Sequence, residues 1–143
     1  MRKPWGTARG RIPASEESLA RNPVHPANAT QQGDLGEAAF LHKATSLGFM
    51  VAKPWGNSYP YDFIVGAGQN LCRVQVKTGT HSRNRVYRVG VHHTSNHKTY
   101  SYADSDFDFA AIYIIPEHTW YIVPVREVVG RTTLHFRKAW KAF

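Results

Sequence analysis

Two polar side chains stand close together in the stretch RVQVKTG, residues 73–79. Apolar and polar residues alternate from Cys72 to Lys77, as they do in a strand with one apolar and one polar face. Gln75 and Lys77 therefore share the polar face, although glutamine and lysine are both depleted in strands. A solvated sheet face would explain them, but threonine or tyrosine would suit such a face better. The pair is therefore a candidate for chemistry as well as for solvation.

Two acidic residues could complete such a site. Lys77 in the low-dielectric surroundings of a sheet needs a counter-charge, and Asp62, at the start of the predicted neighbouring strand, can supply it. Glu37 lies in a predicted helix, three and four residues before Phe40 and Leu41, so it projects from or beside the buried face. An acid in that place needs a partner, because a buried unpaired carboxylate is costly.

A helix and a hairpin are expected to position these four residues. The helix is predicted within GDLGEAAFLHKATSLGF, residues 33–49, with Asp34 as its cap and Gly48 as its left-handed end. Strands at 61–66 and 70–77, joined by the turn AGQN, are predicted to form the hairpin. The apolar stripe of the helix is predicted to comprise Phe40, Leu41, Ala44 and Leu47.

The rest of the chain predicts further strands and a closing helix. A short helix is expected between Pro124 and Val129, and the helical spacing of Phe136, Ala139, Trp140 and Phe143 predicts a C-terminal helix. The order of helix, several strands and helix indicates an α/β sandwich rather than a doubly wound sheet. The additional strands are predicted at 49–54, 86–91, 108–115 and 119–125.

At the four polar residues the sequence resembles the PD-(D/E)xK nuclease superfamily. That family has an acid on a helix, an acid at the start of one hairpin strand, and acid-x-Lys on the next. The corresponding stretches here are GDLGEAAF, YPYDFIV and RVQVKTG, and the resemblance extends from about Gly33 to Trp140. It implies an α/β fold with a restriction-endonuclease-like core, in which helices flank a central mixed β-sheet in an α-β-β-β-α-β order.

The resemblance also implies roles for the site residues. Asp62 would hold Mg²⁺, or Mn²⁺ as a substitute, with Gln75, the backbone carbonyl of Val76 and Glu37 as further ligands. Lys77 would orient the attacking water or neutralise charge that develops on the phosphate. The implied function is Mg²⁺-dependent DNA cleavage, either homing or restriction-like, or similar to Holliday-junction resolution by archaeal members. One site cuts one strand, so a duplex break implies a homodimer or a higher homo-oligomer.

Gln75 departs from the family pattern, which usually has an acid in this place. A subset of members, including certain intron-encoded homing endonucleases, is similar in using glutamine. An amide oxygen can still ligate a hard cation, but one negative charge is lost, so metal affinity should fall unless Glu37 contributes. Two alternatives therefore stay open: an inactive nucleic-acid-binding module on a nuclease scaffold, and a basic domain with no role at nucleic acid.

The charge of the chain favours a polyanionic partner. The 143 residues carry a formal net charge of +8, and the pI is about 9.9. No Asp or Glu occurs between Asp62 and Asp104, and the basic stretch TGTHSRNRVYR follows Lys77 directly. An ordinary solvated basic loop is the alternative to DNA contact there. The residues expected to contact DNA are Arg73, Thr78, His81, Arg83, Arg85, Arg88 and Lys98.

Composition limits the expected cellular location and domain organisation of the protein. Its single cysteine, Cys72, excludes an intrachain disulfide and fits a reducing compartment, so a cytoplasmic location is expected. No apolar run approaches the roughly 20 residues of a membrane span, so no membrane partner is expected. Residues 1–31 are interrupted by prolines and predict a flexible basic arm, followed by a single nuclease domain at 32–143.

Two other stretches could hold metals. VHHTSNHK, residues 91–98, has a histidine and asparagine set like that of HNH nucleases, and clustered histidines can bind zinc. The span is too compressed for such a unit, so a basic surface loop is favoured. YADSDFDF, residues 102–109, contains three acids, for which turn capping and pairing with basic neighbours are favoured over a metal site.

Overall fold

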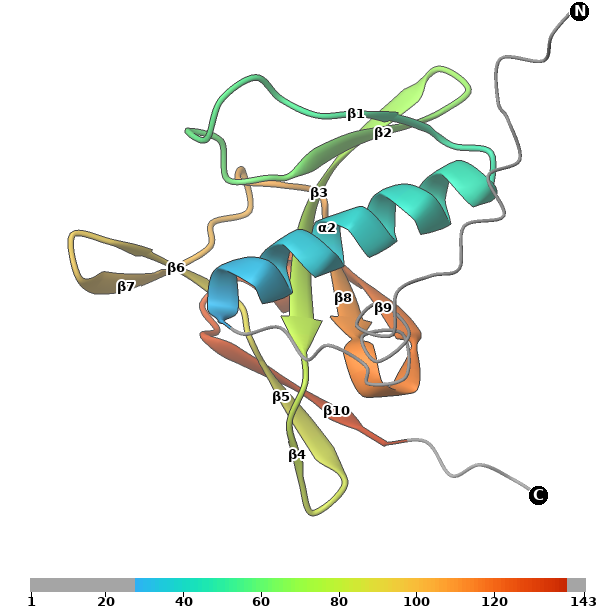
Figure 1. The fold of residues 1–143 in the computed structure, drawn as a ribbon. Coiled ribbons are helices and arrows are strands. Elements are labelled where there is room, and N and C mark those ends of the chain that lie inside the picture. Colours follow the sequence, from blue (N-terminus) through green and yellow to red (C-terminus); the bar gives the residue numbers. More distant parts are fainter. Residues whose placement is uncertain (1–27, 139–143) are drawn as a thin grey trace, which may run out of the picture.

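A computed structural model of the protein describes residues 28–138, and residues 1–27 and 139–143 lie outside this description (Figure 1). One helix and a five-stranded sheet form its centre. These elements are α2 (Ala29–Ser46), β1 (Met50–Ala52), β2 (Phe63–Ala67), β3 (Asn70–Gly79), β8 (Phe109–Ile114) and β9 (Thr119–Pro124). The others are β4 (Ser82–Arg83), β5 (Val86–Gly90), β6 (His92–Ser95), β7 (Lys98–Ser101), β10 (Thr133–Arg137) and the short 3₁₀ helices η1 (Ile115–Glu117) and η2 (Val125–Glu127).

The central sheet is mixed and has the strand order β1-β2-β3-β8-β9. β3 and β8 pair in parallel, whereas the other neighbours are antiparallel. The predicted hairpin of β2 and β3 is confirmed, but β2 pairs only with the first half of β3, Asn70 to Val74. One further backbone bond follows, from Asp62 N–H to Val74 O. Beyond it the strands separate, so the second half of β3 has an open edge on the side of β2.

Hairpins rather than a helix connect the parallel strands β3 and β8. The chain between them forms β4–β5 and β6–β7, and α2 is the only α-helix among residues 28–138. The α-helix that the family resemblance implies between the strands is therefore wrong for residues 28–138, whereas the short helix predicted between Pro124 and Val129 is present as η2. The two basic stretches form hairpins where loops were predicted. Each hairpin turns on two residues with positive φ, Asn84–Arg85 and Asn96–His97. This is the backbone of a type I′ turn, which asparagine tolerates well.

Two apolar cores lie on opposite faces of the central sheet. Ala111 of β8 packs toward α2 with Phe63 and Val74, whereas its strand neighbours Ala110 and Ile112 face the other way, as the period of a strand requires. There they meet residues of the small sheet β10-β5-β4. The predicted C-terminal helix is wrong at Phe136, which lies in β10 opposite Tyr87; Ala139, Trp140 and Phe143 lie outside the described residues.

Helix α2 begins earlier than predicted. Asn28, not Asp34, is the cap, because its side chain accepts from Gln31 N–H at 2.9 Å. The end at Gly48 is confirmed by its φ of +84°. Gly36, Phe40 and Ala44 form the buried stripe of the helix, whereas the predicted stripe residues Leu41 and Leu47 are exposed. No helix in the described part of the chain is long and apolar enough to cross a bilayer.

Gly36 brings α2 against β3 and yields a test of this packing. A Cβ at Gly36 would lie 2.4 Å from Thr78 Cγ2, and Thr78 is held by the amide of Gln32, whose Nε2 donates to Thr78 Oγ1 at 2.8 Å. We expect Gly36→Ala to lower the free energy of unfolding by about 1–3 kcal/mol through overpacking. The measurement is urea unfolding followed by circular dichroism.

Gly33 provides the matched control in the same helix. A Cβ there meets nothing within 4 Å, and alanine has the higher helix propensity by about 1 kcal/mol. Gly33→Ala should therefore be as stable as the wild type or more so. Equal stability of the two variants would contradict close packing at Gly36.

Candidate active site

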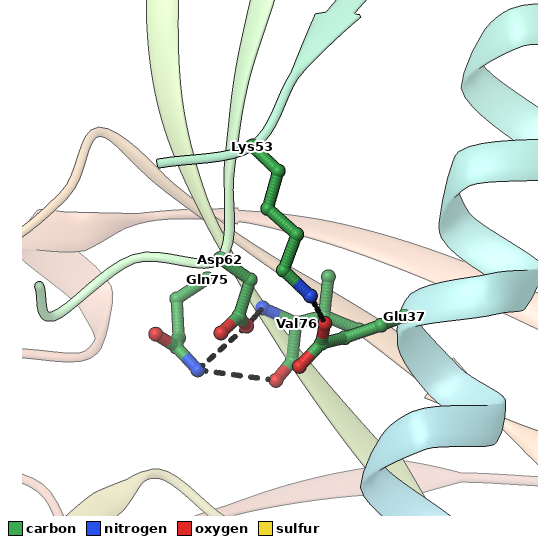
Figure 2. A network of polar contacts seen from close by, with 5 residues as sticks. All are labelled: Glu37, Lys53, Asp62, Gln75 and Val76. Carbon is green, nitrogen blue, oxygen red and sulfur yellow. Dashed lines mark hydrogen bonds and ion pairs between the residues drawn. The ribbon is translucent and has the colours of Figure 1, made fainter. Parts of the chain in front are cut away.

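Asp62 is fixed at the point where β2 and β3 separate. Its Oδ2 accepts from Val76 N–H at 2.7 Å and from Gln75 Nε2 at 2.8 Å (Figure 2). Val76 N–H points to the open edge of β3 and has lost the strand partner that β2 would supply, so the carboxylate takes the place of the next ladder bond. This acceptor role holds the acid in one orientation against β3.

Gln75 is buried and turns its amide nitrogen toward oxygen atoms. Nε2 donates to Asp62 Oδ2 and, at 3.3 Å, to the carbonyl oxygen of Val76 (Figure 2). A carboxylate in this position would repel Asp62, whereas the neutral amide hydrogen-bonds to it. Half a turn of the amide would present Oε1 beside the same two oxygens. The glutamine therefore adds a polar group beside Asp62 without adding a second negative charge.

Lys77 extends from the same face of β3 into more apolar surroundings. Its Nζ donates to His92 O at 3.3 Å and lies 5.4 Å from the centre of the Tyr102 ring. Burial lowers the pKa of Lys77, and the nearby charge of Asp62 only partly opposes this. Burial also raises the pKa of Tyr102 to about 12, so its ring stays an uncharged support for the ammonium group.

Asp62 has a shifted pKa for the same reason. Burial raises the pKa of its carboxyl, the Val76 N–H lowers it, the charge of Glu37 raises it, and the lysine charges of Lys77 and Lys53 lower it. The net direction is upward. A partly desolvated acid beside a desolvated lysine is typical of functional sites.

Glu37 follows the closely packed Gly36 in α2 and faces the region of Asp62 and Gln75. It forms an ion pair with Lys53, which follows β1 (Figure 2). The hydrogen bond to Glu37 is the main reason that the pKa of Lys53 is raised. Lys53 was not predicted as a site residue: it lies near the end of the strand predicted at 49–54, and nothing local indicates its pairing with Glu37, although its stretch KPWG occurs at both residues 3–6 and 53–56.

One pocket joins these residues. It has a volume of about 280 Å³, and all four predicted catalytic residues line it. On the helix side, small residues of α2 line it beside Glu37. The lining residues are Ala29, Gly33, Glu37, Asp62, Gln75, Val76, Lys77 and Thr78.

The donor atoms of the pocket fit a hard divalent cation. Asp62 and Glu37 offer carboxylate oxygens, Val76 a carbonyl oxygen, and Gln75 an amide oxygen after its half turn; Mg²⁺ and Mn²⁺ prefer such ligands. Within residues 28–138, no three side chains of His, Cys, Asp or Glu lie close enough to hold a metal. A cation in this pocket would thus depend on the amide and carbonyl oxygens as well as on the two acids. The HNH-like alternative gains no support in this part of the chain.

The predicted DNA-contacting residues fall into two groups. His81, Arg83, Arg85, Arg88 and Lys98 are exposed on or beside the two hairpins. Arg73 is instead paired with Asp108, at 3.1 Å between Nη2 and Oδ1, and donates to Ser105 O. Thr78 lines the pocket and accepts from Gln32. Contact with DNA remains a prediction for all seven residues.

Two of the three acids before β8, Asp106 and Asp108, have structural partners, as expected. Asp106 Oδ2 accepts from Ala103 N–H at 2.8 Å, which closes a turn. Asp108 Oδ2 accepts from the backbone N–H of Arg73 at 2.7 Å, and the Arg73 side chain lowers the pKa of Asp108. These contacts join the start of β8 to β3.

A second pocket, of about 380 Å³, lies between the C-terminal half of α2 and the central sheet. Apolar side chains such as Phe40, Phe49 and Trp120 line it, and Lys43 is its single charged residue. It contains no acid and no histidine. The chemistry therefore belongs to the smaller polar pocket.

Comparisons with known proteins point to the same group of residues. A family model described as PD-(D/E)XK endonuclease matches residues 27–142, which include the whole polar pocket. The structure is similar to the solved structure of the bacterial homing endonuclease I-Ssp6803I, with a TM-score of 0.72 and 26% sequence identity over 80% of this chain and 82% of that chain. No curated protein matches the chain.

The lowered pKa of Lys77 predicts a pH-dependent stability cost. Burial outweighs the attraction to Asp62, so at neutral pH the protonated amine opposes folding. We expect Lys77→Met, which keeps an unbranched apolar stem, to unfold at a higher urea concentration than the wild type at pH 7 in EDTA.

This difference should shrink as the pH rises. Between the lowered pKa of the folded state and about 10.4, the unfolded wild type binds more protons at Lys77 than the folded protein does, so wild-type stability increases with pH. Urea midpoints from pH 7 to pH 10 measure this. Lys98→Met, at an exposed position on β7, is the control; a gap between Lys77→Met and the wild type that is absent or independent of pH would contradict the burial argument.

Proposed function

This chain belongs to the PD-(D/E)XK endonuclease family, and on that premise we propose that it is a metal-dependent DNA endonuclease that hydrolyses phosphodiester bonds. The observation that carries the proposal is the convergence of Glu37, Asp62, Gln75 and Lys77 on one polar pocket. They come from a helix, a strand start and the middle of β3, so their meeting depends on the fold and not on sequence neighbourhood.

Asp62, Glu37, Gln75 and the carbonyl of Val76 would hold Mg²⁺, with Mn²⁺ as a substitute. A bound cation of this kind polarises the scissile phosphate and lowers the pKa of a coordinated water. Asp62 is already oriented by two hydrogen bonds. This pre-organisation reduces the rearrangement needed at the moment of reaction.

Lys77 would place its ammonium group at the attacking water or at the phosphate. The carbonyl of His92 and the Tyr102 ring hold the group, and its partial desolvation strengthens its interaction with a phosphate anion. The lysine keeps at least one free donor, because an ammonium group has three.

The two hairpins supply a suitable surface for DNA. Both project from the body of the molecule (Figure 1), and a two-stranded ribbon fits the major groove. The exposed basic residues on or beside them would neutralise phosphates and so position the duplex.

Among DNA endonucleases, we favour homing-like or restriction-like cleavage over junction resolution. The similarity to a bacterial homing endonuclease supports this choice. Cutting both strands of a duplex would then require a homodimer or a higher assembly, since residues 28–138 of each chain form one such pocket.

An inactive DNA-binding module is the second candidate. Gln75 stands where the family usually has an acid, and the carboxylate of Glu37 forms an ion pair with Lys53. Both features reduce the negative charge available to a cation, so this candidate has a specific basis.

Cleavage assays separate the two candidates. With Mg²⁺, we expect nicking of supercoiled plasmid that EDTA abolishes, and a loss of about 10²–10³-fold or more in Asp62→Ala and in Lys77→Ala. Asp104→Ala, which removes an exposed acid away from the pocket, should cut as the wild type does. Undiminished cutting by either site variant would refute the assignment, and a four-way junction substrate tests the resolvase type.

Salt dependence tests the hairpin surface. Removing two phosphate contacts in the double variant Arg83→Ala/Lys98→Ala should make the slope of log affinity against log salt shallower by about 2. Fluorescence anisotropy of a duplex in EDTA measures the slope without cleavage. Lys43→Ala, at the apolar pocket, should keep the wild-type slope; the same slope in all three proteins would place the DNA elsewhere.

A further inference from the structure

Lys53 reaches the active-site pocket from outside the four-residue constellation. Figure 2 shows it extending from the chain after β1 toward the carboxylate of Glu37, on the side of Asp62. Its Nζ also lies 5.5 Å from the centre of the Phe63 ring. A second lysine, besides Lys77, is therefore paired with a residue that lines the pocket.

The charges around the pocket balance. Glu37 and Asp62 are the acids, Lys77 and Lys53 are the bases, and Gln75 is neutral. Lys53 holds Oε2 of Glu37, so a cation that binds this carboxylate through either oxygen comes close to the ammonium group, and like charges at such short range repel strongly. Binding of a cation and the Lys53–Glu37 pair are thus in competition.

Lys53 can move at little cost. Its side chain is 62% exposed, compared with 29% for Glu37. An exposed ion pair of this kind contributes little to stability, with a typical value below about 1 kcal/mol. A phosphate group of DNA at the pocket would offer Lys53 another anion.

We propose that Lys53 is a positioning residue that limits the access of a divalent cation to Glu37 until a DNA phosphate draws it away. The inference rests on the proposed function. It makes cation binding and DNA binding mutually favourable, because each displaces or recruits the same ammonium group, and such coupling is reciprocal.

Calorimetric titration of Mn²⁺ into the DNA-free protein tests the first half. Lys53→Met retains a stem that can cover Phe63 but loses the charge. We expect it to bind Mn²⁺ about tenfold more tightly than the wild type. Lys53→Arg, which keeps a charge there, should stay close to the wild type, and Lys43→Met is the control for loss of an unrelated lysine.

A mixed-sequence duplex with phosphorothioate linkages tests the second half. Saturation with this duplex should raise the Mn²⁺ affinity of the wild type and change that of Lys53→Met much less. In EDTA, Lys53→Met should bind the duplex more weakly than the wild type does, as measured by fluorescence anisotropy.

The outcomes distinguish this inference from the proposed function. If Lys53→Met and the wild type bind Mn²⁺ equally without DNA, or if DNA leaves the wild-type Mn²⁺ affinity unchanged, the role of Lys53 is overturned. Asp62→Asn in the same titration tests the metal site itself. Weaker Mn²⁺ binding by Asp62→Asn preserves the site whatever Lys53 does, and unchanged binding removes the basis of both proposals.

Discussion

The separation of β2 from β3 is the constraint on which the rest of the site depends. Had the two strands stayed paired, Val76 N–H would bond to a strand and its carbonyl would be covered. Because β2 begins only at Phe63, the carboxylate of Asp62 takes that donor, and the carbonyl of Val76 stays accessible at the pocket. The unpaired N–H of Val76 thus holds the carboxylate of Asp62 in the site.

The sequence predicted this part of the molecule because its signals are local. Alternation along residues 72–77 identified β3 and the shared face of Gln75 and Lys77, and the turn AGQN identified the hairpin. Asp62 then followed from the charge of Lys77. The residues that were missed lack a local pattern: Lys53 meets Glu37 only because β1 and α2 lie together in the folded chain.

The errors in the fold share a different cause. Basic, polar stretches such as SRNR and SNHK have the composition of loops, yet residues with positive φ at Asn84 and Asn96 close them as hairpins. Phe136 fits a helical spacing with residues that follow it, but pairing with β5 places it in a strand. Asp34 and Asn28 are both favourable helix caps, so residue type alone could not show that the helix begins after Asn28.

The two hairpins between β3 and β8 determine which parts of the sequence can vary without affecting the polar pocket. β5 pairs with β10 along its length, and the His93 ring contacts the Tyr102 ring, while the turn residues of both hairpins belong to neither core. Substitutions of exposed side chains on the hairpins, such as Arg83 and Lys98, therefore leave both cores undisturbed. The exposed surface of the hairpins and the lining of the polar pocket can therefore vary independently within one small domain.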